Sequence, residues 1–482
     1  MDQGQRIIKN SFFVTGGQSL NKIISLVSVP IIARLLGTEG FGAYTLVFSV
    51  VMLFSGISDV GLENLTIRDV SRDKNLLNRF LSNSLFLRFF ITVIIYFLII
   101  LTAKFLNYSE EIFQLIAILG VIIFANFLIN TLNAVIISLE KMEISSSILV
   151  LQNMINPLTT VIMLYLKFDL RSIFLTIIIL NLLLAAIYLF AINKLLLKIK
   201  LEIDWKFWKY LLVNALPFAI INILTFVYLY NGVIILSKIQ DIETVGIYNA
   251  ANKLVMAFLF IPSSLIIAFF PAIARQSIEA IKVNVKNSCQ YATRALFLIA
   301  FPTAIVFTLL SRPIIELLFG KDYLEAAPIL VILGWVMFFI FIASPLSLTI
   351  INSKFLKKFI LLFSAITVFS IFLNIIFILL FNIYGIALSI LLTELIRFLS
   401  YFIFIRKYLE FKIDLFRILI KPVILGLIVM LIILLFKFMG LNAIITIGLS
   451  AILYIILLFL SKEYIFVSLI KKIIKLKSFK SN

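Results

Sequence analysis

Long runs of apolar residues, separated by short polar or charged segments, follow one another along almost the whole chain. A helix needs about 20 apolar residues to cross the roughly 30 Å hydrocarbon core of a bilayer, and these runs reach that length. They are too long and too continuous for the alternating strands of about ten residues that build a membrane barrel. The pattern therefore predicts an all-α integral membrane protein.

Charged or turn-forming segments divide the chain into fourteen predicted transmembrane helices. The predicted spans are 11–35, 41–66, 81–103, 112–139, 146–166, 172–193, 210–236, 246–270, 291–311, 327–350, 359–381, 385–405, 418–438 and 441–460. A count of twelve applies instead if two of the weaker runs, such as 146–166, lie in the membrane interface.

The placement of Lys and Arg predicts the orientation of the chain. Of the 42 Lys and Arg residues, 30 fall in alternate segments that include both termini, 8 fall in the opposite set of loops, and the remaining four lie inside predicted spans. Cytoplasmic loops carry the excess of positive charge, so both termini are expected to be cytoplasmic. This orientation also requires an even number of spans.

Two short motifs resemble each other in sequence and in predicted position. RLLGTEGFGAY, Arg34 to Tyr44, lies between spans 1 and 2, and ETVGIY, Glu243 to Tyr248, lies between spans 7 and 8. Each has a glutamate, a glycine three residues later and a tyrosine two further on. An even number of helices separates them, which indicates a parallel repeat about an axis normal to the membrane. We expect two six-helix lobes, 1–200 and 201–407, with two added helices and a basic tail in 408–482, and we expect both motifs to be architectural turns on the outer face.

Composition excludes several other classes of protein. The chain is 63% hydrophobic, far above the roughly 45 to 50% of soluble proteins. Its formal charge of +19 is spread over loops between spans, so nucleic acid is not an expected partner. With no histidine and one cysteine, Cys289, neither a disulfide framework nor a Cys/His zinc site is possible, and no cofactor is expected.

Two segments are predicted to contact the membrane surface. Trp205 and Trp208 stand beside lysines, as interfacial anchors do. The C-terminal segment from Ser468 to Lys480 alternates apolar and basic residues at helical spacing. Such a helix is attracted to an anionic leaflet, so membrane lipids are expected partners.

The stretch VPIIARLLGTEGFGAYTLVFSVVMLFSGISDVGLENLTIRDVSR, Val29 to Arg72, resembles the signature of bacterial polysaccharide exporters of the oligosaccharide flippase (Wzx) type. That family belongs to the superfamily of the multidrug/toxin (MATE) exporters and the lipid II flippases. Further matching stretches are NALPFAIINILTF from Asn214, VGIYNAANKLVMAFLFIPSSLIIAFFPAIAR from Val245, IIELLFGKDYLEAAPILVILGW from Ile314 and YGIALSILLTELIRF from Tyr384. The resemblance covers most of the chain up to about residue 407. One departure is Asn231, where many relatives carry an aspartate.

The resemblance implies a transporter rather than an enzyme. Its expected cargo is a polyprenyl-diphosphate-linked oligosaccharide repeat unit, as used for O-antigen, lipopolysaccharide or capsule. The cargo would move across the bacterial inner membrane by alternating access coupled to an ion gradient. Helices 1, 2, 7 and 8 are expected to line the cavity, and helices 13 and 14 to shelter the lipid tail. A polymerase and a chain-length regulator of the same pathway are further expected partners.

Three alternatives stay open at this point. A lipid II flippase would share the resemblance, and a MATE-like drug or ion antiporter would place acidic groups in its cavity. A membrane polysaccharide polymerase or ligase is the remote alternative. Such an enzyme generally needs a large external loop, whereas the longest predicted outer loop, about Ser311 to Ala327, is short, and no histidine is present to act as a general base.

Four cations inside predicted spans are candidate substrate-binding residues, because a charge within the membrane needs a partner, a wet cavity or a function. Lys22 lies near the middle of span 1, and Lys253 lies two turns into span 8. Both ammoniums would attract a diphosphate, although Lys22 could instead pair with Asp59 and Lys253 could extend outward. Arg88 and Arg397 are plausible phosphate ligands at the inner mouth.

For Arg397, a structural ion pair is favoured over phosphate binding, because Glu394 lies three residues earlier on the same helical face. Asp59, Glu63 and Arg68 close span 2 on the cytoplasmic side. They are candidates for an inner gate or for ion coupling, with structural ion pairing as the alternative.

Neutral groups that could contact a glycan occur in three predicted spans. Their alternative role is to join helices by hydrogen bonds worth about 0.6 kcal/mol each. They are Asn126, Asn130 and Asn133 in span 4, Gln152, Asn153 and Asn156 in span 5, and Asn222 with Thr225 in span 7.

Overall fold

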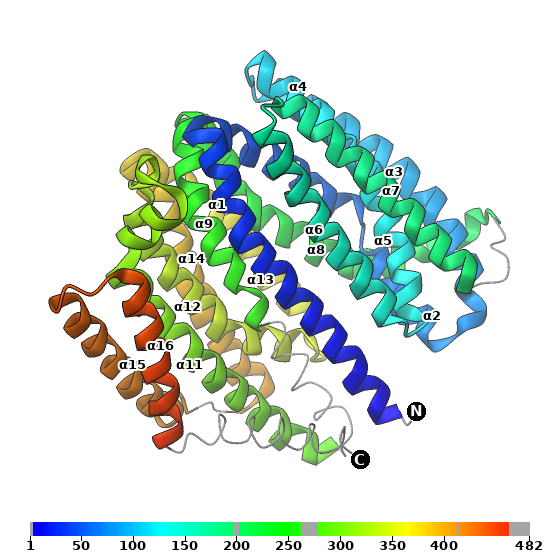
Figure 1. The fold of residues 1–482 in the computed structure, drawn as a ribbon. Helices are drawn as coiled ribbons and strands as arrows, with labels where there is room; N and C mark the ends of the chain where they lie inside the picture. The colour runs from blue at the N-terminus through cyan, green and yellow to red at the C-terminus, as the bar shows by residue number, and fades with distance from the viewer. Residues whose placement is uncertain (1–2, 196–201, 263–277, 412–413, 462–482) are drawn as a thin grey trace, which may run out of the picture. The chain divides into compact units, whose positions relative to one another are not determined.

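The computed structural model describes residues 3–195, 202–262, 278–411 and 414–461, and within these ranges the chain forms helices joined by short connections (Figure 1). The helices up to residue 258 are α1 (Gln3–Ser58), α2 (Leu62–Arg72), α3 (Leu77–Phe105), α4 (Glu110–Gly120), α5 (Ile122–Ser138), α6 (Met142–Tyr165), α7 (Leu170–Leu195), α8 (Trp205–Ile239) and α9 (Ile242–Phe258). The later ones are α11 (Ile278–Phe319), α12 (Ala326–Ile351), α13 (Leu356–Phe381), α14 (Ile383–Phe404), α15 (Leu415–Phe438) and α16 (Ala443–Leu460). Short 3-10 helices, η1 (Lys74–Leu76) and η3 (Lys321–Tyr323), and a π-helix, η4 (Ile405–Leu409), complete the described elements.

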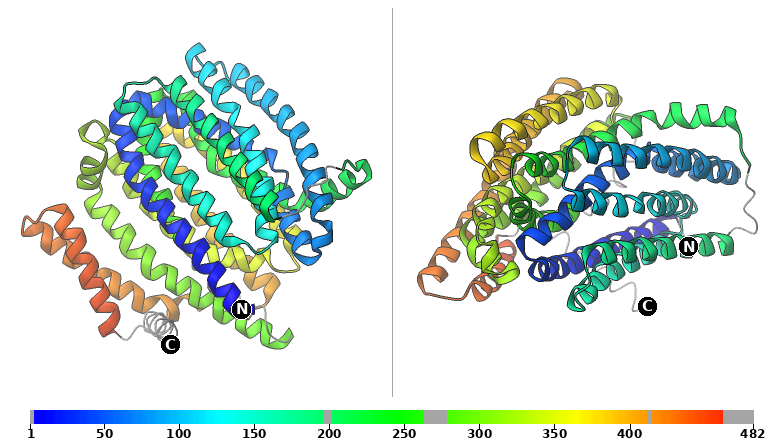
Figure 2. Two further views of the ribbon diagram at one scale, coloured as in Figure 1. Left: turned by 45° about the vertical axis from the view of Figure 1, so that its right-hand side comes forward. Right: turned by 90° about the horizontal axis from the view of Figure 1, so that it is seen from above.

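The predicted all-α membrane fold is confirmed. Thirteen helices in the described ranges are long and apolar enough to cross a membrane. The first of them, Leu20–Ser58, covers most of the predicted spans 1 (11–35) and 2 (41–66). It is interrupted at Gly37, whose φ of 71° breaks the helix, and the dark-blue ribbon reverses direction in both views (Figures 1 and 2). The end of span 8 and the basic tail from Ser468 to Lys480 lie outside the described residues.

The chain forms two compact units. The first comprises residues 1–257 and 360–389, and the second comprises 258–359 and 390–482. The predicted lobes 1–200 and 201–407 and their two-fold relation stay a prediction.

In the first unit, α1 packs against both α6 and α8, and α5 packs against α2, α3 and α7. Period-3.6 apolar faces of these helices bury a common core at the end of the bundle where α2 lies. Its central members are Leu62, Leu65, Phe80, Leu81, Leu132, Val135, Ile136, Tyr188, Leu211 and Ala215.

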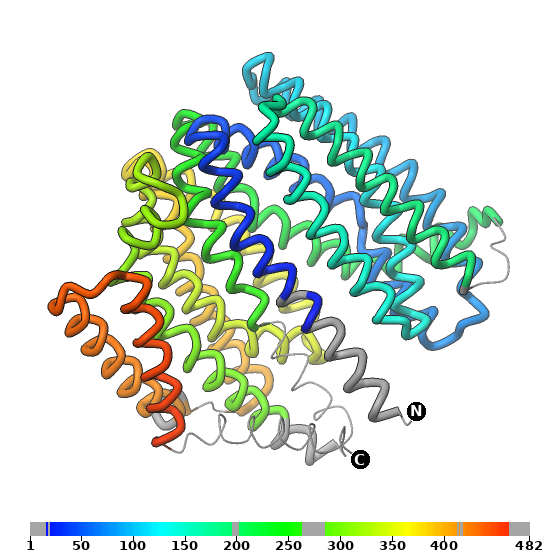
Figure 3. The backbone as a smooth tube through the Cα atoms, in the orientation of Figure 1, coloured from blue at the N-terminus to red at the C-terminus, as the bar shows by residue number. Residues whose placement is uncertain are grey.

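In the second unit, α11 packs against α12 and α15, and α15 and α16 lie side by side as the orange and red segments of Figure 3. A small core of Leu298, Leu425 and Leu458 joins α11, α15 and α16. The Tyr454 hydroxyl donates a 2.6 Å hydrogen bond to the carbonyl oxygen of Leu298. The two additional C-terminal helices are thus attached to α11.

The two repeated motifs meet in the first unit. They are helical rather than open turns: Glu243 to Tyr248 begin α9, and the Gly37 break precedes the matching residues of α1. A Cβ atom at Gly42 would lie 1.9 Å from the carbonyl oxygen of Ile242, and one at Gly246 would lie 2.0 Å from that of Thr38. Glycine at both positions allows the two backbones to approach this closely.

Candidate functional site

A cavity of about 350 Å³ lies inside the first unit, between α1, α5, α6, α7, α8 and α9. Its walls combine aromatic rings with amide and hydroxyl groups. The polar lining residues are Asn21, Ser25, Ser28, Thr45, Ser49, Asn126, Gln152, Asn153, Asn156, Asn181 and Lys253, and the aromatic ones are Phe41, Tyr44, Phe48 and Tyr230. Among the described residues that line it there is no carboxylate. The lining suits a polar, hydroxyl-rich or anionic group better than a cationic one.

Lys253 is the cation of this cavity wall. Lys22 is half-buried on α1, next to the lining residue Asn21, and its charge repels that of Lys253. Two ammoniums that repel each other in a low-dielectric region favour an anion placed near both of them. The structure therefore brings together the two lysines that the sequence suggested, although their role in binding stays a prediction.

A row of amides forms one side of the cavity. The Gln152 side chain donates a 2.7 Å hydrogen bond to Oδ1 of Asn181, and Nδ2 of Asn181 contacts Oδ1 of Asn156 at 3.4 Å. These bonds join α6 to α7, so the amides act as interhelical contacts and line the cavity at the same time. The sequence left open whether these amides contact a glycan or join helices, and their positions here are compatible with both roles.

The three asparagines predicted to form one stripe on α5, Asn126, Asn130 and Asn133, do not all line the cavity. Asn126 lines the cavity and donates a 3.4 Å hydrogen bond to Ser55, whereas Asn130 and Asn133 are not among the lining residues. Oδ1 of Asn133 accepts a 2.6 Å hydrogen bond from Ser145. Of the three, Asn126 keeps the arrangement expected for glycan contact.

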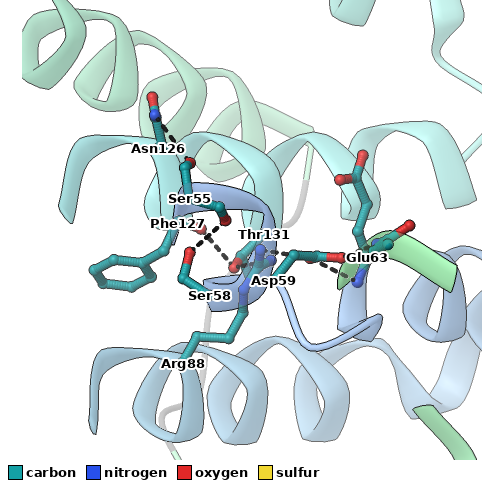
Figure 4. Close-up of polar contacts among 9 residues, drawn as sticks. Ser55, Ser58, Asp59, Glu63, Arg88, Asn126, Phe127 and Thr131 are labelled. Atoms are coloured by element: carbon teal, nitrogen blue, oxygen red, sulfur yellow. Dashed lines mark hydrogen bonds and ion pairs between the residues drawn. The ribbon is translucent and has the colours of Figure 1, made fainter. Parts of the chain in front are cut away.

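A buried ion pair occupies the break between α1 and α2 (Figure 4). Nη2 of Arg88 lies 2.6 Å from Oδ1 of Asp59, and the Arg88 side chain is 1% exposed. Nη1 of Arg88 donates a 2.8 Å hydrogen bond to Thr131 on α5. The second carboxylate oxygen of Asp59 accepts a 2.8 Å bond from the amide of Asn222 on α8.

This arrangement bears on the roles predicted for Lys22, Arg88 and Asn222. Asp59 pairs with Arg88, not with Lys22, so the alternative partner considered for Lys22 is occupied. The Arg88 charge is compensated, and its contacts favour a structural role over a phosphate ligand at the inner mouth. Asn222 is likewise held by Asp59 and does not line the cavity. The backbone N–H of Glu63 donates a 3.3 Å bond to the same aspartate.

Arg68 forms an ion pair with its neighbour Asp69, at 2.7 Å, rather than with Asp59 or Glu63. Asp69 also accepts a 2.9 Å hydrogen bond from the Tyr210 hydroxyl, which ties α2 to α8. Burial by itself would raise the pKa of Asp69, but the hydrogen bonds from Arg68 and Tyr210 outweigh it and lower the pKa below its ordinary value. Asp59, Glu63 and Arg68 therefore do not form one charged group. Asp59 binds Arg88 and the backbone N–H of Glu63, whereas Arg68 binds Asp69.

Arg397 lies in the second unit and pairs with Glu394 at 2.5 Å within α14. The Glu394 side chain is fully buried. The ion pair between Arg397 and Glu394 that the i, i+3 spacing suggested is therefore observed.

Sequence reasoning missed several lining residues, among them Asn21, Tyr44, Asn181 and Tyr230. The motif containing Tyr44 was expected to be architectural, yet this ring lines the cavity. Asn181 is 1% exposed and interrupts the apolar run IIILNLLL. A single amide within a membrane span is a signal for a partner or a function and could have pointed to this site.

The fold is shared with known membrane transporters. One solved structure, of the lipid II flippase MurJ in an inward closed conformation, matches with a TM-score of 0.76 at 18% identity, over 95% of this chain and 100% of that one. An inward-facing MATE multidrug transporter matches with a TM-score of 0.64 at 15% identity, over 82% and 94% of the two chains. At these identities the similarity shows the fold of the class.

The family follows from the sequence comparison. The family model described as "Polysaccharide biosynthesis protein" matches residues 7–277, and the chain belongs to this family. A Shigella flexneri protein named "Putative O-antigen transporter" is 27% identical over 337 residues, 66% of this chain and 78% of that protein. The resemblance to bacterial polysaccharide exporters is confirmed by the family match, and the fold is the one shared by the MurJ and MATE structures.

Proposed function

We propose that this protein is a flippase that carries a polyprenyl-diphosphate-linked oligosaccharide repeat unit from the cytoplasmic to the periplasmic leaflet of a bacterial inner membrane. The observation that carries the proposal is the cavity lined by amides, aromatic rings and Lys253, with no carboxylate among its described lining residues. Amides and hydroxyls offer hydrogen bonds to sugar hydroxyls, and the ammonium offers a partner to phosphate. The family and the O-antigen transporter relative support the same cargo.

The size of the cavity bears on how transport would proceed. A volume of about 350 Å³ lies at the lower end of the roughly 300 to 1,000 Å³ typical of small-molecule sites. It admits part of a glycan or the diphosphate but not a whole repeat unit. Alternating access therefore requires the helices around the cavity to separate while the prenyl tail stays in the lipid. An ion gradient is the proposed source of energy.

The lipid II flippase is the second candidate function, because the fold comparison with MurJ covers the full length of that protein. A MATE-like exporter of cationic drugs is disfavoured, because such a cargo calls for acidic groups that the described cavity lining does not contain. The two lipid-linked cargoes differ in what loss of the gene does. Loss of surface polysaccharide in a viable strain supports the proposal, whereas arrest of wall synthesis supports lipid II.

The direct test replaces Lys253 of the cavity wall and Lys22, which follows the lining residue Asn21. In a deletion strain, Lys253→Met and Lys22→Met keep the length of the side chain but remove its charge. We expect each to abolish surface polysaccharide while the protein reaches the membrane in normal amount. Lys104→Met, which removes an exposed lysine in the last turn of α3, is the matched control and should restore polysaccharide fully. Normal polysaccharide in both the Lys253→Met and the Lys22→Met strain would contradict the proposed role of these lysines.

A further inference from the structure

A group of basic and aromatic side chains lies at one end of the second unit, where the α12–α13 connection meets the end of α14. Three lysine ammoniums converge on two rings. Lys358 Nζ lies 4.2 Å from the centroid of the Tyr408 ring, Lys354 Nζ lies 5.3 Å from that of Phe355, and Lys407 Nζ lies 5.6 Å from that of Tyr408. We call these five residues the Lys–aromatic cluster.

The rings of the cluster are held in place by their neighbours. The ring centroids of Phe355 and Tyr408 lie 5.4 Å apart. The centroid of Tyr408 lies 4.7 Å from that of Phe404, which is buried in α14. Tyr408 lies in the π-helix η4. Because ring faces attract ammonium groups, the two rings hold the ammonium groups of the three lysines close to one another.

Among the described residues around the cluster, basic side chains outnumber carboxylates. Lys357 and Arg406 are exposed beside it, which makes five basic side chains against the two exposed carboxylates nearby, Glu410 and Asp414. In the described part of the chain, no ion pair joins Lys354, Lys358 or Lys407 to a carboxylate. Aromatic rings carry no net charge, so an excess of positive charge faces outward and fits an anion.

The adjacent surface of α14 is apolar. Leu399 and Ile403 are 47% and 61% exposed, and they lie two turns and one turn, respectively, before Arg406 and Lys407 on the same face of the helix. A basic group at the end of an exposed apolar helix face matches a phospholipid, whose phosphate lies at the water boundary and whose acyl chains lie along the span. The loop charges predict this end to be cytoplasmic.

We propose that the Lys–aromatic cluster is a binding site for the phosphate head group of an anionic phospholipid of the cytoplasmic leaflet. The ammoniums of Lys354, Lys358 and Lys407 contact the phosphate oxygens, and the acyl chains lie along Leu399 and Ile403. The residues of this site belong to the second unit, and none of them lines the cavity of the first.

The test uses the full-length protein in detergent, with native mass spectrometry as the readout of bound lipid. Phosphatidylglycerol is added to the wild type and to the triple variant Lys354→Gln/Lys358→Gln/Lys407→Gln. The matched control, Lys141→Gln/Lys206→Gln/Lys209→Gln, removes three other exposed lysines of predicted cytoplasmic segments. We expect the cluster variant to bind phosphatidylglycerol at least about tenfold more weakly, the control to match the wild type, and phosphatidylcholine to bind weakly to all three.

A second variant separates the rings from the charges. Phe355→Leu/Tyr408→Leu keeps every lysine, and we expect a smaller loss of phosphatidylglycerol because the ammoniums are no longer held together. Equal losses in the cluster and control triples would overturn the proposal, as would equal binding of phosphatidylcholine. Displacement of the lipid by millimolar inorganic phosphate would assign the site to a free anion and would also overturn it.

Discussion

Thr38 donates a 2.7 Å hydrogen bond to the carboxylate of Glu243, 205 residues later in the chain. The bond joins the two repeated motifs and lies beside the close approach of Gly42 and Gly246. Two segments that resemble each other in sequence thus contact each other reciprocally. The contact holds α1 against α9, the two helices that carry the cavity-lining residues Tyr44 and Lys253.

This contact predicts that Gly246→Ala destabilises the protein. The added Cβ would lie 2.0 Å from the carbonyl oxygen of Thr38, so the two backbones must separate. Overpacking of this kind costs about 1–3 kcal/mol, and we expect a lower melting temperature of the purified protein. Gly448→Ala in α16 is the control, because a Cβ there meets nothing within 4 Å. A Gly246→Ala protein as stable as the wild type would show that the contact opens without cost.

The buried ion pair predicts a strong dependence on both of its members. Arg88→Leu leaves the Asp59 carboxylate without its charged partner, and removing one member of a buried pair costs about 3–5 kcal/mol. We expect Arg88→Leu/Asp59→Asn to be more stable than Arg88→Leu, because the uncompensated charge is gone. A double-mutant cycle on thermal unfolding measures the coupling, and additive effects of the two substitutions would argue against a direct pair.

The start of α8 depends on Asn83. This side chain is fully buried and accepts hydrogen bonds from the backbone N–H of Asp204, at 2.8 Å, and from the indole N–H of Trp208, at 3.0 Å. Asn83→Leu removes the acceptor of both half-buried donors, at about 1 kcal/mol for each hydrogen bond lost. We expect a markedly lower melting temperature. Asn214→Leu, which removes an exposed amide of α8, should change it little.

The contact between Asp69, Arg68 and Tyr210 predicts a pH dependence. Because the folded-state pKa of Asp69 is lowered, its contribution to stability is present above the unfolded pKa of about 3.9 and is lost as the pH falls through the folded value. Asp69→Asn should therefore be less stable than the wild type at pH 7. The difference in melting temperature should narrow as the pH is lowered from about 5 toward 3. A difference that stays constant over this range would show that the carboxylate charge is not the cause.

The spans, the helix break at the first motif and the family could be predicted from the sequence. Each depends on local properties: the length of an apolar run, the residues of a short motif, or the i, i+3 spacing that pairs Glu394 with Arg397. Local signals suffice because a helix in a bilayer satisfies its backbone hydrogen bonds within itself.

The partners of the buried polar groups were decided by the tertiary structure. Nothing in the sequence indicates that Asp59 meets Arg88 and Asn222, that Asn181 and Tyr44 line the cavity, or that Asn133 binds Ser145 instead of lining it. These contacts depend on the rotation of each helix about its axis and on which helix lies next to it. In spans that are apolar almost all round, the hydrophobic pattern does not specify that rotation, and close packing of the assembled helices does.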